Sequence, residues 1–403
     1  MIKKIVIANL ASPENPGDHA ILMGTIKAIR SVLEDVDITI STRAIFYEDY
    51  YFKEGLKAIA SYPNVDCLNI DDSFSKLLKI PSALKTPSEL RESVKDSDYV
   101  FLAGGAYFYS YRKGAPGLTY LSHISASYWA KKFSKPVILM PQSYGPFNSF
   151  IAEKLFEYVL RYAKKVYFRE QITGGYLKEK FEPYFSKATE MPDLALFLER
   201  KDILDDSIAI PDQNKKTIGV TLRPWNVDGV DAYDYAEKLS DALTSVARQR
   251  DLKVKIIVQV MDQKKTEGDE NISEHLKALL YKKCPNLSVE LLCEKPFFSL
   301  SKICSLYASC DMLIGMRLHS SLLSFVVGCP ALTVGYQHKA EGILKMLNLE
   351  KLYLGSYQKV SIKELEDRIL EVLDHRAIYV EKIEKELENA RQRISDAFKE
   401  VFE

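Results

Sequence analysis

The sequence predicts an α/β protein made of two Rossmann-like domains, each with a doubly wound parallel sheet. Short apolar runs alternate with amphipathic helical patterns along most of the chain, as strands and crossover helices do in such sheets. The runs are almost continuously apolar, which is typical of parallel strands buried on both faces. A chain of 403 residues is also too long for one core, so two domains are expected.

The first domain is predicted to span residues 1–205. Its strands are expected at 5–10, 38–41, 65–70, 99–102, 137–140 and 166–168. Its helices are expected at 19–33, 119–133 and 150–162. A charged, proline-containing stretch at 198–216 has little periodicity and is interpreted as the linker.

The second domain is predicted to span residues 206–360, where the alternation starts again. Its strands are expected at 218–222, 254–260, 289–292, 312–315 and 331–334. Its helices are expected at 233–250, 272–281, 300–308 and 320–327. The last segment, 361–403, is long, charged and helical in pattern.

Composition excludes several classes of protein. The 55 basic and 55 acidic residues balance, which argues against a nucleic-acid partner but leaves room for a local basic pocket. None of the six cysteines forms a C-x-x-C pair, so no metal site is expected and a reduced, cytoplasmic setting fits best. The apolar run at 5–10 is too short for a signal peptide, and no run approaches the roughly 20 apolar residues of a membrane span.

Ligands of doubly wound sheets bind outside the carboxyl ends of the strands, so the loops after strands hold the candidate residues. The first loop, 11–18, contains Asn15, Gly17 and Asp18, and Asp18 either contacts a ligand or caps the following helix. A second loop contains Gly104 and Gly105, which let a ligand or a neighbouring backbone approach closely.

A third loop, 141–147, carries Gln142 and Ser143 in a rigid turn between proline and glycine; an ordinary turn is the alternative interpretation. Arg169 ends a predicted strand, where a buried guanidinium needs an anion. The adjacent Glu170 is one possible partner, and a bound ligand is the other. Arg223, which follows strand 218–222, would need an anionic partner in the second domain for the same reason.

The segment 314–319 is the most informative, because it follows a strand and opens a helix. Helix N-termini attract anions, and Arg317 adds a bidentate donor for a phosphate or carboxylate. His319 titrates near neutral pH, and Lys339 follows the next strand. Adjacent strands would bring these three basic residues to one edge of the sheet; the alternative is a structural histidine.

These loops, in this order, resemble the polysaccharide pyruvyl transferase family. The matching segments are 15–18, 104–105, 142–147, 169–170 and 314–319, continuing through 328–330 to Tyr336 and Lys339. The resemblance extends from residue 5 to about residue 349. The chain departs from the family pattern at Ala103, at Glu170 and at Leu194, where the family often has glycine, aspartate and proline.

The resemblance implies two facing Rossmann-like domains of the glycosyltransferase-B type, with ligands bound between them and the last helical segment crossing back onto the first domain. It implies transfer of pyruvate from phosphoenolpyruvate to two hydroxyls of a sugar, which forms a cyclic ketal and releases phosphate. The acceptor side would be the first domain and the donor side the second. Phosphoenolpyruvate is then a co-substrate, no cofactor is expected, and a lipid-linked acceptor would bring the protein to the inner membrane face.

The candidate residues suit this chemistry. Phosphoenolpyruvate carries a carboxylate and a phosphate, so its site needs cations, for which the candidates are Arg169, Arg223, Arg317 and Lys339. Ketal formation moves protons at each step, which indicates His319 as general acid and base. Two other functions fit the same pattern: a glycosyltransferase that uses a nucleotide sugar, and a non-catalytic protein that binds a sugar or an anion.

Overall fold

The computed structural model describes residues 2–61, 87–111, 113–204, 215–227, 230–261, 268–335 and 338–403. The chain divides into two compact units. The first consists of Met1–Pro13, Ile21–Leu194 and Arg393–Glu403, and the second of Glu14–Ala20 and Ala195–Gln392. The predicted strand 65–70 and the middle of the predicted linker lie outside the described residues.

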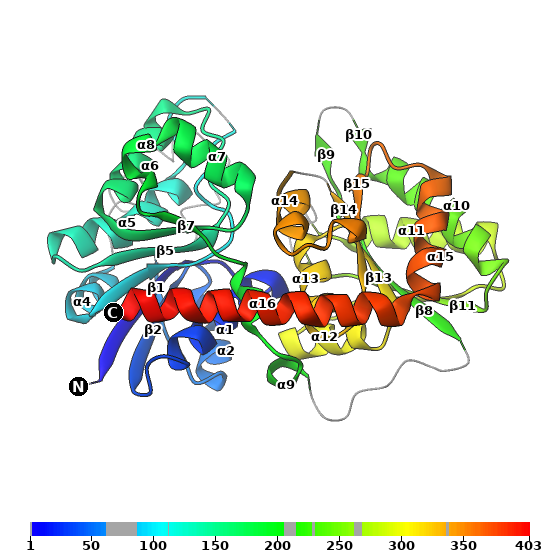
Figure 1. Cartoon of the computed structure of the whole chain (residues 1–403), viewed down its shortest axis with the longest axis horizontal. Coiled ribbons are helices and arrows are strands. Elements are labelled where there is room, and N and C mark those ends of the chain that lie inside the picture. The colour runs from blue at the N-terminus through cyan, green and yellow to red at the C-terminus, as the bar shows by residue number, and fades with distance from the viewer. Residues whose placement is uncertain are drawn as a thin grey trace. The chain divides into compact units, whose positions relative to one another are not determined.

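The first unit is built on a seven-stranded parallel sheet in the order β3-β2-β1-β4-β5-β6-β7 (Figure 1). The strands are β1 (Lys3–Leu10), β2 (Val36–Thr42), β3 (Lys57–Ala60), β4 (Tyr99–Leu102), β5 (Val137–Gln142), β6 (Ala163–Phe168) and β7 (Ala188–Glu190). The helices are α1 (Pro16–Arg30), α2 (Glu48–Lys53), α4 (Ser88–Asp96), α5 (Leu118–Lys132), α6 (Phe150–Tyr162), α7 (Gln171–Lys180) and α8 (Glu182–Phe185). The strand order reverses between β1 and β4.

The second unit repeats this plan with a six-stranded parallel sheet in the order β12-β11-β8-β13-β14-β15. Its strands are β8 (Lys216–Thr221), β11 (Leu252–Ile257), β12 (Ser288–Leu292), β13 (Met312–Gly315), β14 (Ala331–Gly335) and β15 (Tyr353–Ser356), with a small ladder of β9 (Asn226–Val227) and β10 (Val230–Asp231). Its helices are α9 (Arg200–Ile203), α10 (Ala232–Ala247), α11 (Glu270–Lys283), α12 (Leu300–Ala308), α13 (Leu318–Val326), α14 (His338–Met346) and α15 (Ile362–Asp374). The prediction of two doubly wound α/β domains is confirmed.

Elements with strong local signals match their predicted bounds, and weakly apolar ones were missed. β4, α6, α12 and β13 have the predicted limits. α6 begins after Ser149, whose hydroxyl accepts a hydrogen bond from the Ala152 amide, which is the usual helix cap. The apolar pattern did not predict β3, β7 or β15, which are edge strands without a run of strongly apolar residues.

The last helical segment is two helices rather than one. α15 ends at Asp374, and α16 (Arg376–Phe402) starts after His375. The end of α16 belongs to the first unit: Phe398 packs edge-on against Phe101, and the Tyr167 hydroxyl donates to the Ala397 carbonyl. The carboxyl terminus lies next to the first sheet in Figure 1.

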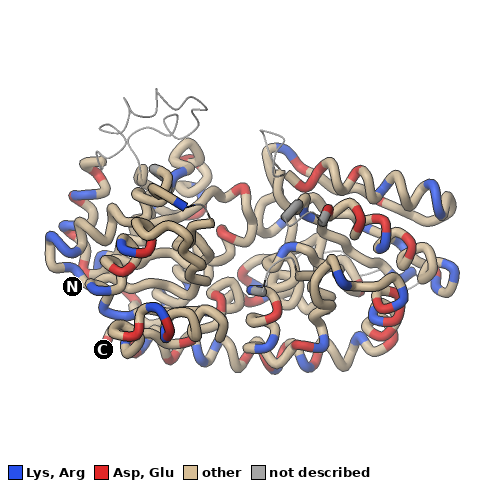
Figure 2. Tube along the Cα trace, turned by 90° about the horizontal axis from the view of Figure 1, so that it is seen from above, with Lys and Arg blue, Asp and Glu red and all other residues tan. Residues whose placement is uncertain are grey.

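Charged residues of both signs are interspersed along the tube in Figure 2, in keeping with the zero net charge. Among the described residues, no helix combines the length and the apolar character needed to cross a lipid bilayer.

The first unit is expected to depend on the end of α16 for its stability. Phe398 is completely buried, so Phe398→Ala is expected to lower the free energy of unfolding of this unit by about 3–5 kcal/mol. The measurement is denaturant unfolding followed by Trp129 fluorescence in a Trp225→Phe background, because these are the only two tryptophans in the sequence. Ile378→Ala, at a position of α16 that is 65% exposed, is the control; an equal loss in both variants would contradict the expectation.

Candidate functional site

Three of the predicted cations follow neighbouring strands of the second sheet. Arg223 comes after β8, Arg317 after β13 and Lys339 after β14, and these strands are adjacent and parallel. The sheet order reverses between β8 and β13, which is the position where doubly wound sheets bind ligands. The topology therefore puts these residues at one edge of the sheet.

The loop that carries Arg317 is fixed by a set of short hydrogen bonds. The Met316 amide donates to the Thr221 carbonyl at 3.0 Å, which ties the loop to the end of β8. The Ser320 hydroxyl lies 2.6 Å from the Arg317 carbonyl, to which it donates, and 2.7 Å from the Thr221 hydroxyl. Gly315 lets α13 start this close to the strand, since a Cβ there would lie 2.5 Å from the Ser321 hydroxyl. The loop is therefore a rigid support for the residues it presents.

Arg317 forms a bidentate ion pair with Asp269, the residue that precedes α11. Its Nε and Nη2 lie 2.7 Å from the two carboxylate oxygens, and the Val260 amide donates to the same carboxylate at 3.0 Å. The Asp269 side chain is fully buried and that of Arg317 is 11% exposed. Burial raises the pKa of Asp269, and the Arg317 guanidinium opposes that rise. The pair holds the plane of the guanidinium in place.

Arg223 adds a second positive charge near the same carboxylate. Its guanidinium carbon lies 4.6 Å from the centre of the Trp225 ring, a cation–π distance, and its charge also acts to lower the pKa of Asp269. The charges of two guanidinium groups thus act on one buried carboxylate. Lys339, half-buried in the first turn of α14, follows the next strand.

His319 is the second residue of α13 and lies against the first turn of α1, which belongs to the same unit. A Cβ built on Gly17 would be only 2.5 Å from both Cγ and Nδ1 of the His319 ring. The first predicted loop, 11–18, is therefore brought close to the histidine of the segment 314–319, which is far away in the sequence. Arg223, Arg317, Lys339, His319 and Gly17 were predicted as site residues from the sequence, and Asp269 was not.

Asn15, and not Asp18, caps α1. The helix starts at Pro16, and the Asn15 side-chain oxygen accepts from the Gly17 amide at 3.1 Å. The Asn15 side-chain nitrogen in turn donates to the Asp18 carboxylate at 2.9 Å. The reason is the position of the proline: Pro is favoured at the first helical residue, which makes the preceding Asn15 the cap.

In the first unit, Arg169 is almost completely buried and paired with Asp193. Its Nη1 lies 2.6 Å from the Asp193 carboxylate, and its Nε donates to the Ser143 hydroxyl at 3.1 Å. The exposed fractions of the two charged side chains are 4% and 1%. Glu170, considered above as the partner of Arg169, instead caps α7 by accepting from the Thr173 amide and hydroxyl.

The two-glycine loop packs against the end of β5. The Gly105 amide donates to the Pro141 carbonyl, and the Ser143 amide donates to the Gly105 carbonyl. A Cβ on Gly104 would lie 2.8 Å from the Pro141 oxygen. Of the two interpretations of these glycines, the contacts support close approach of a neighbouring backbone.

A buried polar cluster that the sequence did not indicate lies at the carboxyl ends of β1, β4 and β5. The Gln142 amide donates to the Tyr107 hydroxyl, and the Tyr107 ring lies 4.6 Å, centre to centre, from the His123 ring. Asn9, in the left-handed conformation at φ 69°, donates to the His123 carbonyl. Burial lowers the pKa of His123 to about 3. Asn9 and His123 were missed because a strand end and a helical pattern show no motif around them.

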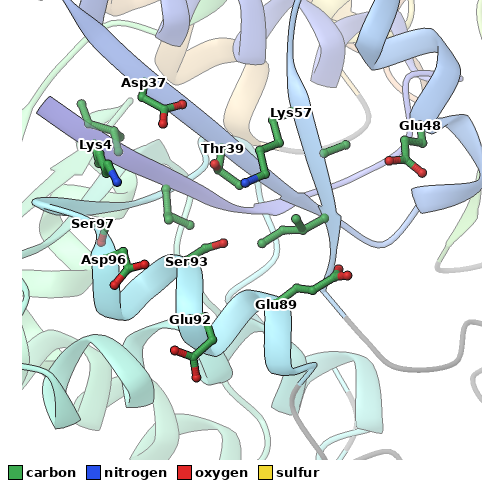
Figure 3. Close-up of a pocket in the computed structure, with 14 residues that line it drawn as sticks. Lys4, Asp37, Thr39, Glu48, Lys57, Glu89, Glu92, Ser93, Asp96 and Ser97 are labelled. Carbon is green, nitrogen blue, oxygen red and sulfur yellow. The ribbon is translucent and has the colours of Figure 1, made fainter. Parts of the chain in front are cut away.

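A cavity of about 460 Å³ lies elsewhere in the first unit, between the amino-terminal halves of the strands and α4 (Figure 3). Its labelled charged residues are mostly acidic, among them Glu48, Glu89, Glu92 and Asp96. None of the predicted site residues lines it, and it is at the wrong edge of the sheet for a ligand of this fold. Within the described part of the chain, no group of three or more histidine, cysteine or acidic residues could hold a metal ion.

Removing the partner of Arg169 is expected to destabilise the first unit. Asp193→Asn leaves a buried guanidinium without its counter-charge, which is expected to cost on the order of 3–5 kcal/mol in denaturant unfolding followed by Trp129. Glu400→Gln breaks the Lys165–Glu400 pair of the same unit, which has a similar 2.7 Å distance but is exposed, and is expected to cost much less. Equal costs would show that burial of the Arg169 pair has no energetic consequence.

The neutral, buried His123 is expected to make the first unit sensitive to acid. Its pKa falls from about 6.5 in the unfolded chain to about 3 in the folded protein, so its stabilising contribution is complete above pH 6.5 and is lost as the pH falls. Between pH 6.5 and pH 5 this loss amounts to about 2 kcal/mol. His123→Phe is expected to remove that part of the pH dependence, and His375→Phe, at an exposed position, to leave it; unfolding curves at both pH values decide.

The chain resembles known proteins in sequence. The model of the polysaccharide pyruvyl transferase family matches residues 15–338. The chain is 25% identical over 378 residues to the amylovoran biosynthesis protein AmsJ of Erwinia amylovora, and the match covers 87% of each chain.

Solved structures that resemble the chain share its fold. A glycosyltransferase from Rickettsia africae has a TM-score of 0.60 at 15% identity, with 98% of this chain and 94% of that chain covered. A UDP-N-acetylglucosamine 2-epimerase has a TM-score of 0.61 at 11% identity, with the same coverage of 98% and 94%. These similarities show the two-domain, glycosyltransferase-B-like fold. The match of the family model over most of the sequence shows more: the chain belongs to the polysaccharide pyruvyl transferase family.

Proposed function

We propose that the protein transfers pyruvate from phosphoenolpyruvate to two hydroxyls of one sugar, forming a cyclic ketal during the synthesis of a cell-surface polysaccharide. The observation that carries this proposal is the edge of the second sheet, where Arg223, Arg317 and Lys339 follow three adjacent strands and His319 stands beside Arg317. Family membership and the similarity to an amylovoran biosynthesis protein support it. The reaction would take place in the cytoplasm, at the inner membrane face where the acceptor is lipid-linked.

The cations at this edge match the donor. Phosphoenolpyruvate has a carboxylate and a phosphate, and guanidinium groups bind such oxyanions in pairs of hydrogen bonds. Arg317 is already oriented by Asp269, so little side-chain freedom would be lost when an anion binds. Arg169 is a further proposed donor contact; its side chain is 4% exposed and is paired with Asp193.

The chemistry requires an acid and a base. C3 of phosphoenolpyruvate takes a proton, the first sugar hydroxyl adds to C2, and the proton of that hydroxyl passes to a base. The C2–O bond to phosphate then breaks, phosphate leaves with the bonding electrons, and the second hydroxyl attacks C2 and loses its proton. His319 is proposed to give and to take these protons, because an imidazole can act both as a general acid and as a general base.

The acceptor is proposed to bind the first unit. Its sheet reverses order between β1 and β4, and the candidate residues there are Gly104, Gly105, Gln142 and Ser143. Asn15, Gly17 and Asp18 are further candidates for acceptor or loop contacts. They belong to the second unit, and Gly17 lies against His319.

Turnover tests the proposal directly. The protein is incubated with phosphoenolpyruvate and a panel of glycosides, and phosphate release and the methyl signal of a ketal are followed. His319→Ala and His319→Asn are expected to lose 10²–10⁴-fold in kcat, since neither side chain exchanges a proton near neutral pH. Lys339→Ala is expected to weaken phosphoenolpyruvate binding on the order of tenfold to a hundredfold. Lys345→Ala, at an exposed position of the same helix, is the control.

Ligand stabilisation separates the rival functions. Phosphoenolpyruvate at a hundredfold excess over its dissociation constant is expected to stabilise the protein by about 2.7 kcal/mol. Stabilisation by a nucleoside diphosphate but not by phosphoenolpyruvate would indicate a nucleotide-sugar glycosyltransferase. Stabilisation by phosphoenolpyruvate without phosphate release from any glycoside would favour a binding protein.

A further inference from the structure

We propose that Gly17, in the first turn of α1, is a positioning residue for His319. A Cβ on Gly17 would lie 2.5 Å from Cγ and Nδ1 of His319 and 2.6 Å from its Cβ. Real Cβ atoms essentially never come within 3.0 Å of another heavy atom, so only glycine permits this approach. The value of the contact for catalysis rests on the function proposed above for His319.

The backbone gives no other reason for a glycine at this position. Gly17 is the second residue of α1, an ordinary right-handed helix, and is not among the glycines with positive φ. In such a helix glycine is about 1 kcal/mol less favourable than alanine. The close approach to His319 is therefore the feature that requires Gly17.

Both sides of the contact have a local conformation that is held by hydrogen bonds. On one side, the Gly17 amide is held by the Asn15 side chain, which also binds Asp18. On the other side, the start of α13 is held by the bonds between Ser320, Arg317 and Thr221. A methyl group on Gly17 must therefore turn the His319 ring and shift the first turn of α13.

The contact lies at one part of the His319 side chain. The three atoms nearest to a Cβ on Gly17 are Cβ, Cγ and Nδ1 of His319. The Nε2 atom of the same ring is buried. Displacement of the ring by a methyl group on Gly17 would change the position of the nitrogens that are proposed to exchange protons.

The first test is the variant Gly17→Ala, with Gly175→Ala as the matched control. Gly175 is also a helical glycine, in α7, but a Cβ there meets no atom within 4 Å. Gly17→Ala is expected to lower kcat at least tenfold, approaching the loss in His319→Asn, while the KM for phosphoenolpyruvate changes much less. It is expected to cause little further loss in a His319→Asn background. Wild-type kcat in Gly17→Ala, beside a large loss in His319→Asn, would overturn the positioning role.

Two measurements do not depend on turnover. In the wild-type protein with labelled glycine and histidine, a nuclear Overhauser effect is expected between the Gly17 Hα and the His319 ring protons. This signal is available even where Gly17→Ala does not fold. The His319 ring resonance, identified by its loss in His319→Asn, is expected to shift in Gly17→Ala and not in Gly175→Ala.

The thermal stability of double variants completes the test. Gly17→Ala is expected to lower the melting temperature, and less so in a His319→Gly background, where the atoms it collides with are gone. Absence of the Overhauser effect, or an equal thermal loss in both backgrounds, would overturn the contact itself. Failure of the proposed function would appear differently: no turnover of phosphoenolpyruvate by the wild type, with the contact intact.

Discussion

A guanidinium at the end of a buried strand needs an anion, because an uncompensated charge in the interior costs several kcal/mol. The protein meets this requirement in the same way in both units. Arg169 follows β6 and pairs with Asp193, and Arg317 follows β13 and pairs with Asp269. In each pair the carboxylate comes from a different element, so the ion pair also fixes a loop.

The two ion pairs differ in how far their arginine side chains are exposed. The Arg169 pair is closed on both sides, with side-chain exposures of 4% and 1%, and is well suited to hold the first unit together. The Arg317 side chain is 11% exposed and has Arg223 near the same carboxylate. Arg223, Arg317 and Lys339 follow adjacent strands at this edge, where a donor with two anionic groups is proposed to bind.

Two glycines at this edge allow neighbouring segments to approach closely, because they have no Cβ. Gly315 allows the hydroxyls of α13 to lie over the end of β13, and Gly17 allows the first turn of α1 to lie against His319. These are contacts between segments, and in neither case does the glycine adopt a positive φ. Such positions are sensitive to a single methyl group, although nothing in their own backbone conformation marks them.

The sequence by itself determined the class of fold and most of the candidate residues. Apolar runs such as 99–102 and 312–315 specify their strands locally, and Arg317, His319 and Lys339 stand at strand ends where the pattern can be seen. Only the tertiary structure decided which groups these candidate residues contact. The pairing of Arg169 with Asp193, the pairing of Arg317 with Asp269 and the contact of Gly17 with His319 all depend on which segments meet in three dimensions. The sequence does not distinguish a buried aspartate from a solvated one.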